Sequence, residues 1–128
     1  MKIPADLKYT KDHEWVRIED NVVVVGVSDY AQSQLGDVVF MDVQTEGDSL
    51  LQGEVFGAIE AVKTVADLYM PLSGEIVTFN SDLESAPESV NKDPYGSGWI
   101  IKVKISKPAE LDSLLNAEAY KALIEDIQ

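Results

Sequence analysis

One amine stands by itself among carboxylates in the middle of the chain. Lys63 is the only basic residue between Arg17 and Lys92, and that stretch contains fourteen Asp and Glu. It lies between two β-branched runs, 55–62 and 66–70, whose composition predicts strands, so we expect it at the turn of a hairpin. Such an amine is either an ordinary solvated lysine at a loop tip or the anchor for a reactive group carried on a long flexible tether.

Side chains for self-contained catalysis are scarce in this sequence. His13 is the single histidine and there is no cysteine, which excludes disulfides, thiol nucleophiles and a zinc site of the usual ligand spacing. No Gly-rich phosphate loop and no G-x-S-x-G elbow occur. Acidic pairs such as Asp12 and Glu14 are expected to be solvated surface in a chain with 23 Asp and Glu. We therefore expect no catalytic residues and no metal, with Lys63 as the residue through which the protein contributes to chemistry.

The composition indicates a folded, strongly acidic protein. Hydrophobic residues make up 45% of the 128 positions, which is ordinary for a globular chain, and the length suits one domain over residues 1–128. The net charge of −13 argues against nucleic acid or an anionic membrane as a partner and favours partners with basic surfaces. No apolar run reaches the roughly 20 residues of a membrane span. With no signal or transit pattern at residues 1–4, we expect a cytoplasmic monomer.

Most of the chain reads as short strands separated by Gly, Asn and Asp. Alternating or β-branched runs predict further strands at 14–18, 22–27, 38–43, 75–80 and 99–105. Between the second and third of these, Asp29 is expected to cap a short helix that ends at a left-handed Gly36. Ser, Pro, Asn and Gly are frequent in residues 81–98, which predicts a surface excursion.

The C-terminal part changes to a helical period. Pro108 suits the first turn of one helix. Asn116 is positioned to cap a second helix that starts at Ala117. The inward faces of these helices are expected to carry Leu111, Leu114 and Leu115 in the first and Tyr120, Leu123, Ile124 and Ile127 in the second.

A series of ordered blocks runs along almost the whole chain, at residues 8–16, 26–32, 35–40, 53–57, 60–63, 67–75 and 90–99. In these blocks the chain resembles the glycine cleavage H-protein family, whose members carry lipoate. The resemblance implies a mainly β fold of the lipoyl/biotinyl type, a flattened barrel-sandwich of two sheets with a short helix and C-terminal helices. It also implies lipoate in amide linkage on Lys63.

The same resemblance implies a shuttle that is not itself an enzyme. In the family, the lipoyl group accepts an aminomethyl group from glycine decarboxylase and delivers it to a tetrahydrofolate-dependent aminomethyltransferase. Dihydrolipoamide dehydrogenase then reoxidises the group, and lipoate-attaching enzymes install it in the first place. All redox chemistry of this cysteine-free chain would come from that attached group.

The loaded arm ends in a protonated amine, and the family is thought to dock it against the carrier. A cleft with carboxylates would hold such a cation and exclude water. By match to the family, Glu14 and Asp67 are the expected docking residues and Asp12 is a weaker third. Each of the three is otherwise a solvated charge.

Two departures from the family pattern and several alternatives remain. Ala61 and Thr64 flank the lysine where relatives usually carry Ser and Ala, and residues 44–46 replace a common Pro-Glu. These changes leave the expected carrier role intact.

The main alternative is a lipoyl relay or a diverged H-like carrier that serves other lipoyl-dependent enzymes. A lipoyl domain of a 2-oxoacid dehydrogenase, a biotin carrier and a non-carrier interaction module fit the sequence less well.

Overall fold

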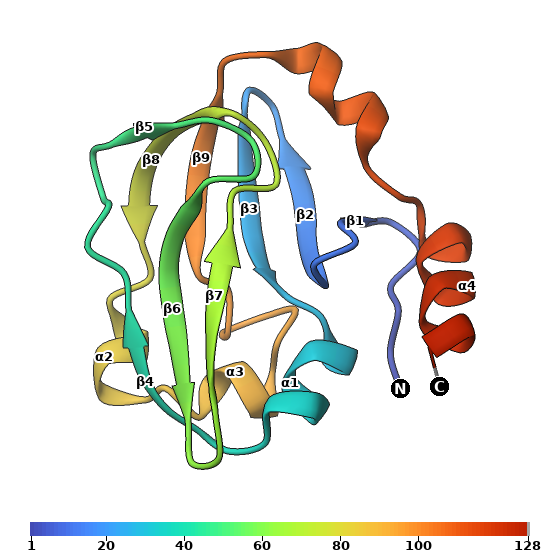
Figure 1. Cartoon of the computed structure of the whole chain (residues 1–128). Helices are drawn as coiled ribbons and strands as arrows, with labels where there is room; N and C mark the ends of the chain where they lie inside the picture. Colours follow the sequence, from blue (N-terminus) through green and yellow to red (C-terminus); the bar gives the residue numbers. More distant parts are fainter. Residues whose placement is uncertain (128) are drawn as a thin grey trace.

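Two antiparallel sheets form the frame of the molecule, in a computed structural model that describes residues 1–127 (Figure 1). The six-stranded sheet has the order β1-β2-β3-β9-β8-β5, and the three-stranded sheet has the order β4-β6-β7. The strands are β1 (Lys8–Tyr9), β2 (Glu14–Glu19), β3 (Val22–Val27), β4 (Val38–Asp42), β5 (Ser49–Leu50), β6 (Val55–Ala61), β7 (Val65–Tyr69), β8 (Gly74–Phe79) and β9 (Ile101–Ile105).

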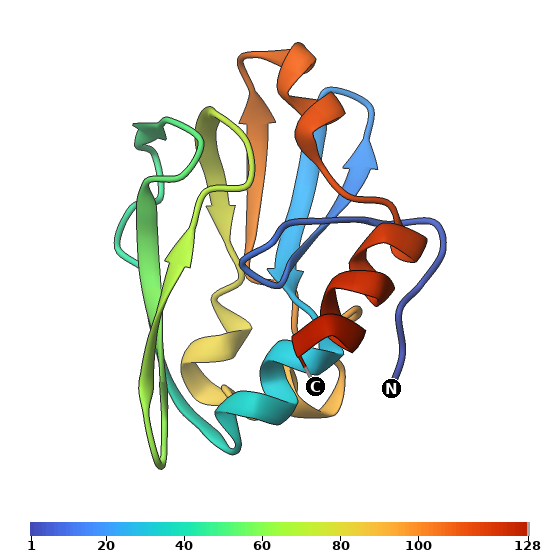
Figure 2. The same ribbon diagram turned by 45° about the vertical axis from the view of Figure 1, so that its right-hand side comes forward.

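The helices are short and lie at the ends and one side of the sheets. They are α1 (Asp29–Leu35), α2 (Asp82–Ser85), α3 (Ser89–Lys92), the 3-10 helix η1 (Pro108–Ser113) and α4 (Ala117–Ile127). In the turned view of Figure 2 the three-stranded sheet stands apart from β9 and β3 as a separate layer. The predicted mainly β sandwich of two sheets is confirmed, and the sheets do not close into a continuous barrel.

The β2–β3 hairpin buries side chains on both of its faces. Val16, Val23 and Val25 belong to the main core together with residues of β6, β8 and β9. Trp15 and Val24 point the other way into a second apolar cluster, which α4 and the N-terminal segment complete. Successive residues of a strand face opposite sides, so a strand covered on both sides reads as the continuous apolar run seen in β3.

The helix α1 is capped by a different residue from the one expected. Ser28 is the N-cap, because its Oγ accepts a hydrogen bond from the Ala31 N–H at 3.1 Å. The prediction of Asp29 as the cap is wrong by one position: Asp29 is the first helical residue, and its carboxylate accepts from the Lys2 N–H and the Gln32 side chain instead. Gly36 ends the helix with a positive φ of 78°, as expected for a glycine, but its ψ of −158° lies outside the left-handed helical region that the sequence predicted.

Residues 81–98 are more ordered and more buried than a surface excursion. They form α2 and α3, and each helix inserts one apolar side chain, Leu83 or Val90, into the main core. Asn91 ties α3 to the start of β4, since its Oδ1 accepts from the Val38 N–H and its Nδ2 donates to the Gly36 carbonyl. Because the segment is otherwise polar, its composition did not indicate that Leu83 and Val90 are core residues.

The C-terminal predictions hold in part. Asn116 caps α4 through a 2.8 Å hydrogen bond from the Ala119 N–H, and Tyr120 and Ile124 are buried as expected. Ile127, predicted to face inward, is 55% exposed, because α4 contacts the body of the protein mainly through its first two turns. The segment after Pro108 is a 3-10 helix, and the last predicted strand starts at Ile101.

We predict that Gly26→Ala destabilises the fold, because a Cβ on Gly26 would lie 2.6 Å from the ring of buried Trp15. The expected loss is about 1–3 kcal/mol in urea unfolding, the usual range for overpacking. The loss should shrink when Gly26→Ala is made in a Trp15→Phe background, since the smaller ring leaves room for the methyl group. An equal loss in both backgrounds contradicts this explanation.

Candidate functional site

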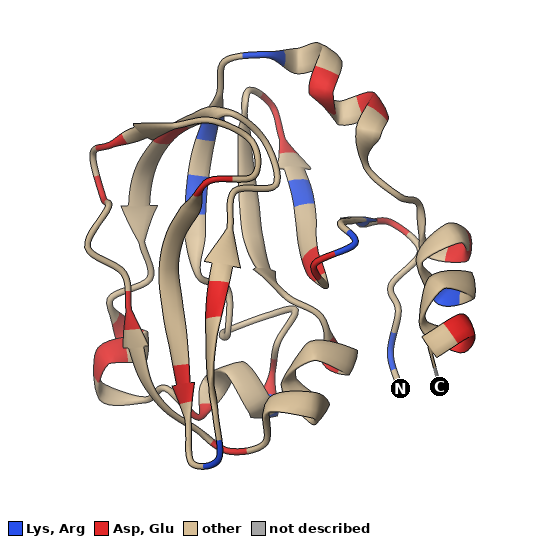
Figure 3. Ribbon diagram, viewed as in Figure 1, with Lys and Arg blue, Asp and Glu red and all other residues tan. Residues whose placement is uncertain are grey.

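Lys63 lies in the turn of the β6–β7 hairpin, as predicted from the sequence. The Ala61 N–H donates to the Thr64 carbonyl at 2.8 Å and closes the turn, and the Val62 N–H donates to the Asp37 carbonyl at 3.0 Å. Lys63 is exposed. Figure 3 shows the turn as a spot of positive charge at the end of the projecting hairpin, with acidic positions along both of its strands.

The surface around the amine combines carboxylates with apolar side chains. Strand pairing aligns Phe40, Glu60 and Val65 across the three-stranded sheet, so their side chains share one face. Phe40 and Val65 are 49% and 62% exposed, and Val62 beside the lysine is 75% exposed. Apolar groups this accessible around one amine provide a surface that another protein can cover.

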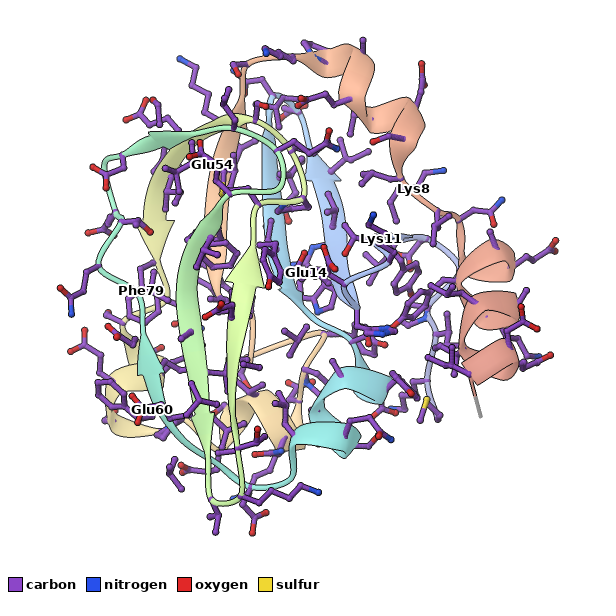
Figure 4. The ribbon with its side chains drawn as sticks, viewed as in Figure 1. Lys8, Lys11, Glu14, Glu54, Glu60 and Phe79 are labelled. Atoms are coloured by element: carbon purple, nitrogen blue, oxygen red, sulfur yellow. The ribbon has the colours of Figure 1, made fainter. Side chains whose placement is uncertain are left out.

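The three predicted docking carboxylates are brought together in one cleft. Asp12, Glu14 and Asp67 line a hollow of about 300 Å³ whose walls come from the start of β2, from α1 and from β6 and β7. Apolar side chains such as Leu35 and Leu68 line the remaining wall. In Figure 4 Glu14 lies at the start of β2, next to β7. Residues 55 positions apart in the sequence, Glu14 and Tyr69, meet here through a hydrogen bond.

Glu14 is a buried acid, so the alternative that it is a solvated surface charge is wrong. Its side chain and backbone together are 2% exposed. The carboxylate accepts a 2.8 Å hydrogen bond from the Tyr69 N–H and a 3.2 Å bond from the Thr10 hydroxyl. Burial raises the pKa of Glu14 to about 8, although the Tyr69 hydrogen bond opposes the shift. Most Glu14 carboxyls are therefore protonated at neutral pH.

Asp12 and Asp67 differ from Glu14 in being exposed, so they keep contact with solvent at the rim of the cleft. One lining residue, His13, was considered in the sequence only as a metal ligand. Its position between Asp12 and Glu14 was the available signal that it belongs to the same site. Within residues 1–127 there is no cluster of three or more potential metal ligands, and no helix is long and apolar enough to cross a membrane.

We predict that Glu14→Gln changes how stability depends on pH. The folded-state pKa of Glu14 is raised, so its contribution to stability is largest at low pH and is lost as pH rises from about 4.5 to about 8. Relative to the glutamine variant, the wild type should lose about 1.4 kcal/mol of unfolding free energy for each pH unit in that window. Urea unfolding at pH 5 and pH 8 measures this difference.

Glu19→Gln is the matched control, because Glu19 is an exposed acid at the other end of the same strand. Its difference from the wild type should stay nearly constant over the same pH range. A constant difference for Glu14→Gln as well contradicts a raised pKa at Glu14.

Comparison with known proteins places this architecture in a defined family. The family model described as the glycine cleavage H-protein matches residues 7–127. The glycine cleavage system H protein of Bacteroides fragilis is 57% identical over 124 residues, which cover 97% of this chain and 98% of that protein. The corresponding protein of Symbiobacterium thermophilum is 56% identical and covers 97% of each chain.

A solved structure agrees with these sequence relatives. The crystal structure of a glycine cleavage system H protein from Mycobacterium marinum aligns with a TM-score of 0.83 at 37% identity, over 94% of this chain and 97% of that one. The resemblance seen in the sequence blocks is thereby confirmed. The chain belongs to the glycine cleavage H-protein family, which consists of carrier proteins and not of enzymes.

Proposed function

We propose that the protein carries lipoate in amide linkage on Lys63 and shuttles an aminomethyl group from glycine decarboxylase to the aminomethyltransferase of the glycine cleavage system. The observation that carries this proposal is the exposed amine in the turn of a projecting hairpin, in a chain of this family. When bound, lipoate supplies a dithiolane that takes up and gives up the cargo and that dihydrolipoamide dehydrogenase reoxidises. The protein itself holds the arm and shields its cargo from water.

The residues present fit a lipoyl arm. An exposed lysine leaves its amine free for acylation, and the cleft offers an apolar wall for the hydrocarbon part together with carboxylates for a cationic end. Along β7, Asp67 lies four residues beyond Lys63, which is roughly 13 Å at the usual strand rise. A lysine side chain with its acyl group covers such a distance in an extended form, so the arm reaches the cleft without any change in the fold.

Within the cleft, Glu14, Asp67 and Asp12 are proposed to hold the ammonium end of the loaded arm. A cation beside Glu14 favours its ionised form and lowers its pKa, so the buried carboxyl would release its proton as the arm arrives. The pair would then be a charge-assisted contact in a place with little water, where such contacts are strongest. Shielding from water delays the breakdown that frees ammonia.

The charge pattern also supports the kind of partner surface that this carrier would meet. Acylation removes the charge of Lys63 and leaves the hairpin with carboxylates such as Glu60 and Asp67. The decarboxylase, the aminomethyltransferase, the dehydrogenase and the lipoate-attaching enzymes are therefore proposed to approach with basic faces around apolar patches. Their association should weaken as ionic strength rises.

Lys63→Arg should abolish lipoylation while the fold is kept, because arginine preserves the charge and lacks the primary amine that forms the amide. Coexpression with a lipoate ligase followed by intact-mass measurement and peptide mapping tests this. The wild type and the Lys92→Arg control should each gain one lipoyl group. Modification at any lysine other than Lys63 contradicts the assignment.

Asp67→Ala and Glu14→Gln should each speed ammonia release from the isolated, aminomethyl-loaded protein. Loss of one charge-assisted hydrogen bond weakens docking by about 1.5–3 kcal/mol, so a rate increase of roughly tenfold or more is expected. Glu60→Gln is the control, since Glu60 is an acid of the same hairpin that does not line the cleft. Release at the wild-type rate in both cleft variants counts against docking.

A further inference from the structure

His13 adopts a backbone conformation that a residue with a side chain rarely takes. Its φ is 69°, and among residues 1–127 Asp20 is the one other non-glycine residue with a positive φ. The segment is held in place by the His13 N–H, which donates to the Thr10 carbonyl at 3.1 Å, and by the Ser28 N–H, which donates to the His13 carbonyl at 2.9 Å. Unfavourable backbone conformations cost of order 1 kcal/mol or more and gather at functional sites. With this backbone conformation the His13 ring lies in the wall of the cleft.

A chain of buried hydroxyl groups holds that ring. The Tyr120 hydroxyl lies 2.9 Å from His13 Nδ1 and 2.6 Å from the Ser28 Oγ, and Ser28 and Tyr120 are fully buried. Tyr120 comes from α4, 107 positions away along the chain, and its ring stacks on Tyr9 with 4.5 Å between centroids. The C-terminal helix therefore holds a residue of the cleft wall without lining the cleft itself.

The direction of these hydrogen bonds follows from counting donors. The Ser28 Oγ already accepts from the Ala31 N–H, and Tyr120 is its one other hydrogen-bond partner within residues 1–127. Ser28 therefore donates its proton to Tyr120, because the reverse order leaves a buried hydroxyl proton without an acceptor. Tyr120 in turn donates to His13 Nδ1. The ring proton of neutral His13 must then be on Nε2.

The same arrangement leaves one ring nitrogen for a ligand. No hydrogen bond in the described part of the chain uses His13 Nε2, and the half-buried ring lines the cleft beside Glu14. Burial lowers the pKa of His13, with nearby Asp12 opposing the shift, so the ring is mainly neutral at pH 7. A neutral ring does not repel a cation held by the carboxylates, and its N–H cannot donate to an ammonium group.

We propose that His13 is a binding residue for the sulfur end of the arm, with its Nε2–H donating to the arm sulfur that does not carry the cargo, and that Tyr120 and Ser28 are its positioning residues. This inference rests on the proposed carrier function. In the docked state the carboxylates accept hydrogen bonds from the ammonium group, and His13 donates a hydrogen bond to a sulfur lone pair. No covalent step is involved.

The proton position is measurable without the arm. Because His13 is the only histidine of the chain, two-bond ¹⁵N–¹H correlations report its tautomer from a single pair of resonances. The unmodified protein should show the Nε2–H form. Tyr120→Phe should give a mixture of tautomers, whereas Tyr9→Phe should keep the Nε2–H form, since the Tyr9 hydroxyl donates to the Pro4 carbonyl. An Nδ1–H form in the wild type overturns the proposal.

The loaded protein tests the contact itself. Loading should shift the Nε2 resonance of the wild type. His13→Gly relieves the unfavourable backbone conformation but also removes the acceptor of the buried Tyr120 hydroxyl, so the two effects on the unfolding midpoint oppose each other. Ammonia release from this variant should be about fivefold faster, the equivalent of one net hydrogen bond. His13→Asn tolerates positive φ and keeps an N–H donor, so its release rate should fall between those of the glycine variant and the wild type.

The outcomes separate this inference from the proposed function. If His13→Gly releases ammonia at the wild-type rate while Asp67→Ala is faster, docking stands and the role of His13 is overturned. If His13→Gly, Asp67→Ala and Glu14→Gln all release ammonia at the wild-type rate, docking itself is overturned, and the role of His13 with it. An Nε2 resonance that does not move on loading also overturns the contact.

Discussion

The hydrogen bond from the Tyr69 N–H to the buried Glu14 carboxyl joins the two sheets at the place where the cleft opens. Tyr69 ends β7 at the edge of the three-stranded sheet, and Glu14 begins β2 in the six-stranded sheet. An unpaired acid in this position would cost several kcal/mol, so the bonds from Tyr69 and Thr10 are needed to keep it inside. Strand β7 begins two residues after Lys63 and ends at Tyr69, which holds Glu14. The distance between amine and acid is thus set by one rigid element.

Charge is distributed in opposite ways inside and outside this site. The chain is strongly acidic, with a net charge of −13, whereas two titratable groups that line the cleft, Glu14 and His13, are mainly neutral at pH 7. A neutral interior is compatible with a cleft that is empty while the arm is undocked. Arrival of a cation changes that balance, because ionised Glu14 becomes favourable only beside a positive charge. Under our proposal the cleft therefore discriminates between a loaded and an unloaded arm.

The sequence predicted the hairpin that carries the site more accurately than the burial and hydrogen bonding of the residues inside the site. The hairpin around Lys63 follows from two β-branched runs and a short break, which are local signals. The burial of Glu14 does not follow from local pattern, because its partner Tyr69 is 55 residues away and only the approach of the two sheets brings them together. For the same reason the chain from Ser28 through Tyr120 to His13 was not foreseen, since it depends on where α4 packs. The wrong cap at Asp29 was a one-residue error in the start of α1.

The central claim is that an arm anchored on Lys63 brings its cation to a protonated Glu14. The most direct measurement is the pH titration of the Glu14 carboxyl ¹³C resonance in the lipoylated protein, with and without the aminomethyl cargo. Our account predicts a midpoint near pH 8 in the unloaded form and a clearly lower midpoint in the loaded form. The same midpoint in both forms, or ordinary titration near pH 4.5 in the unloaded form, would contradict it.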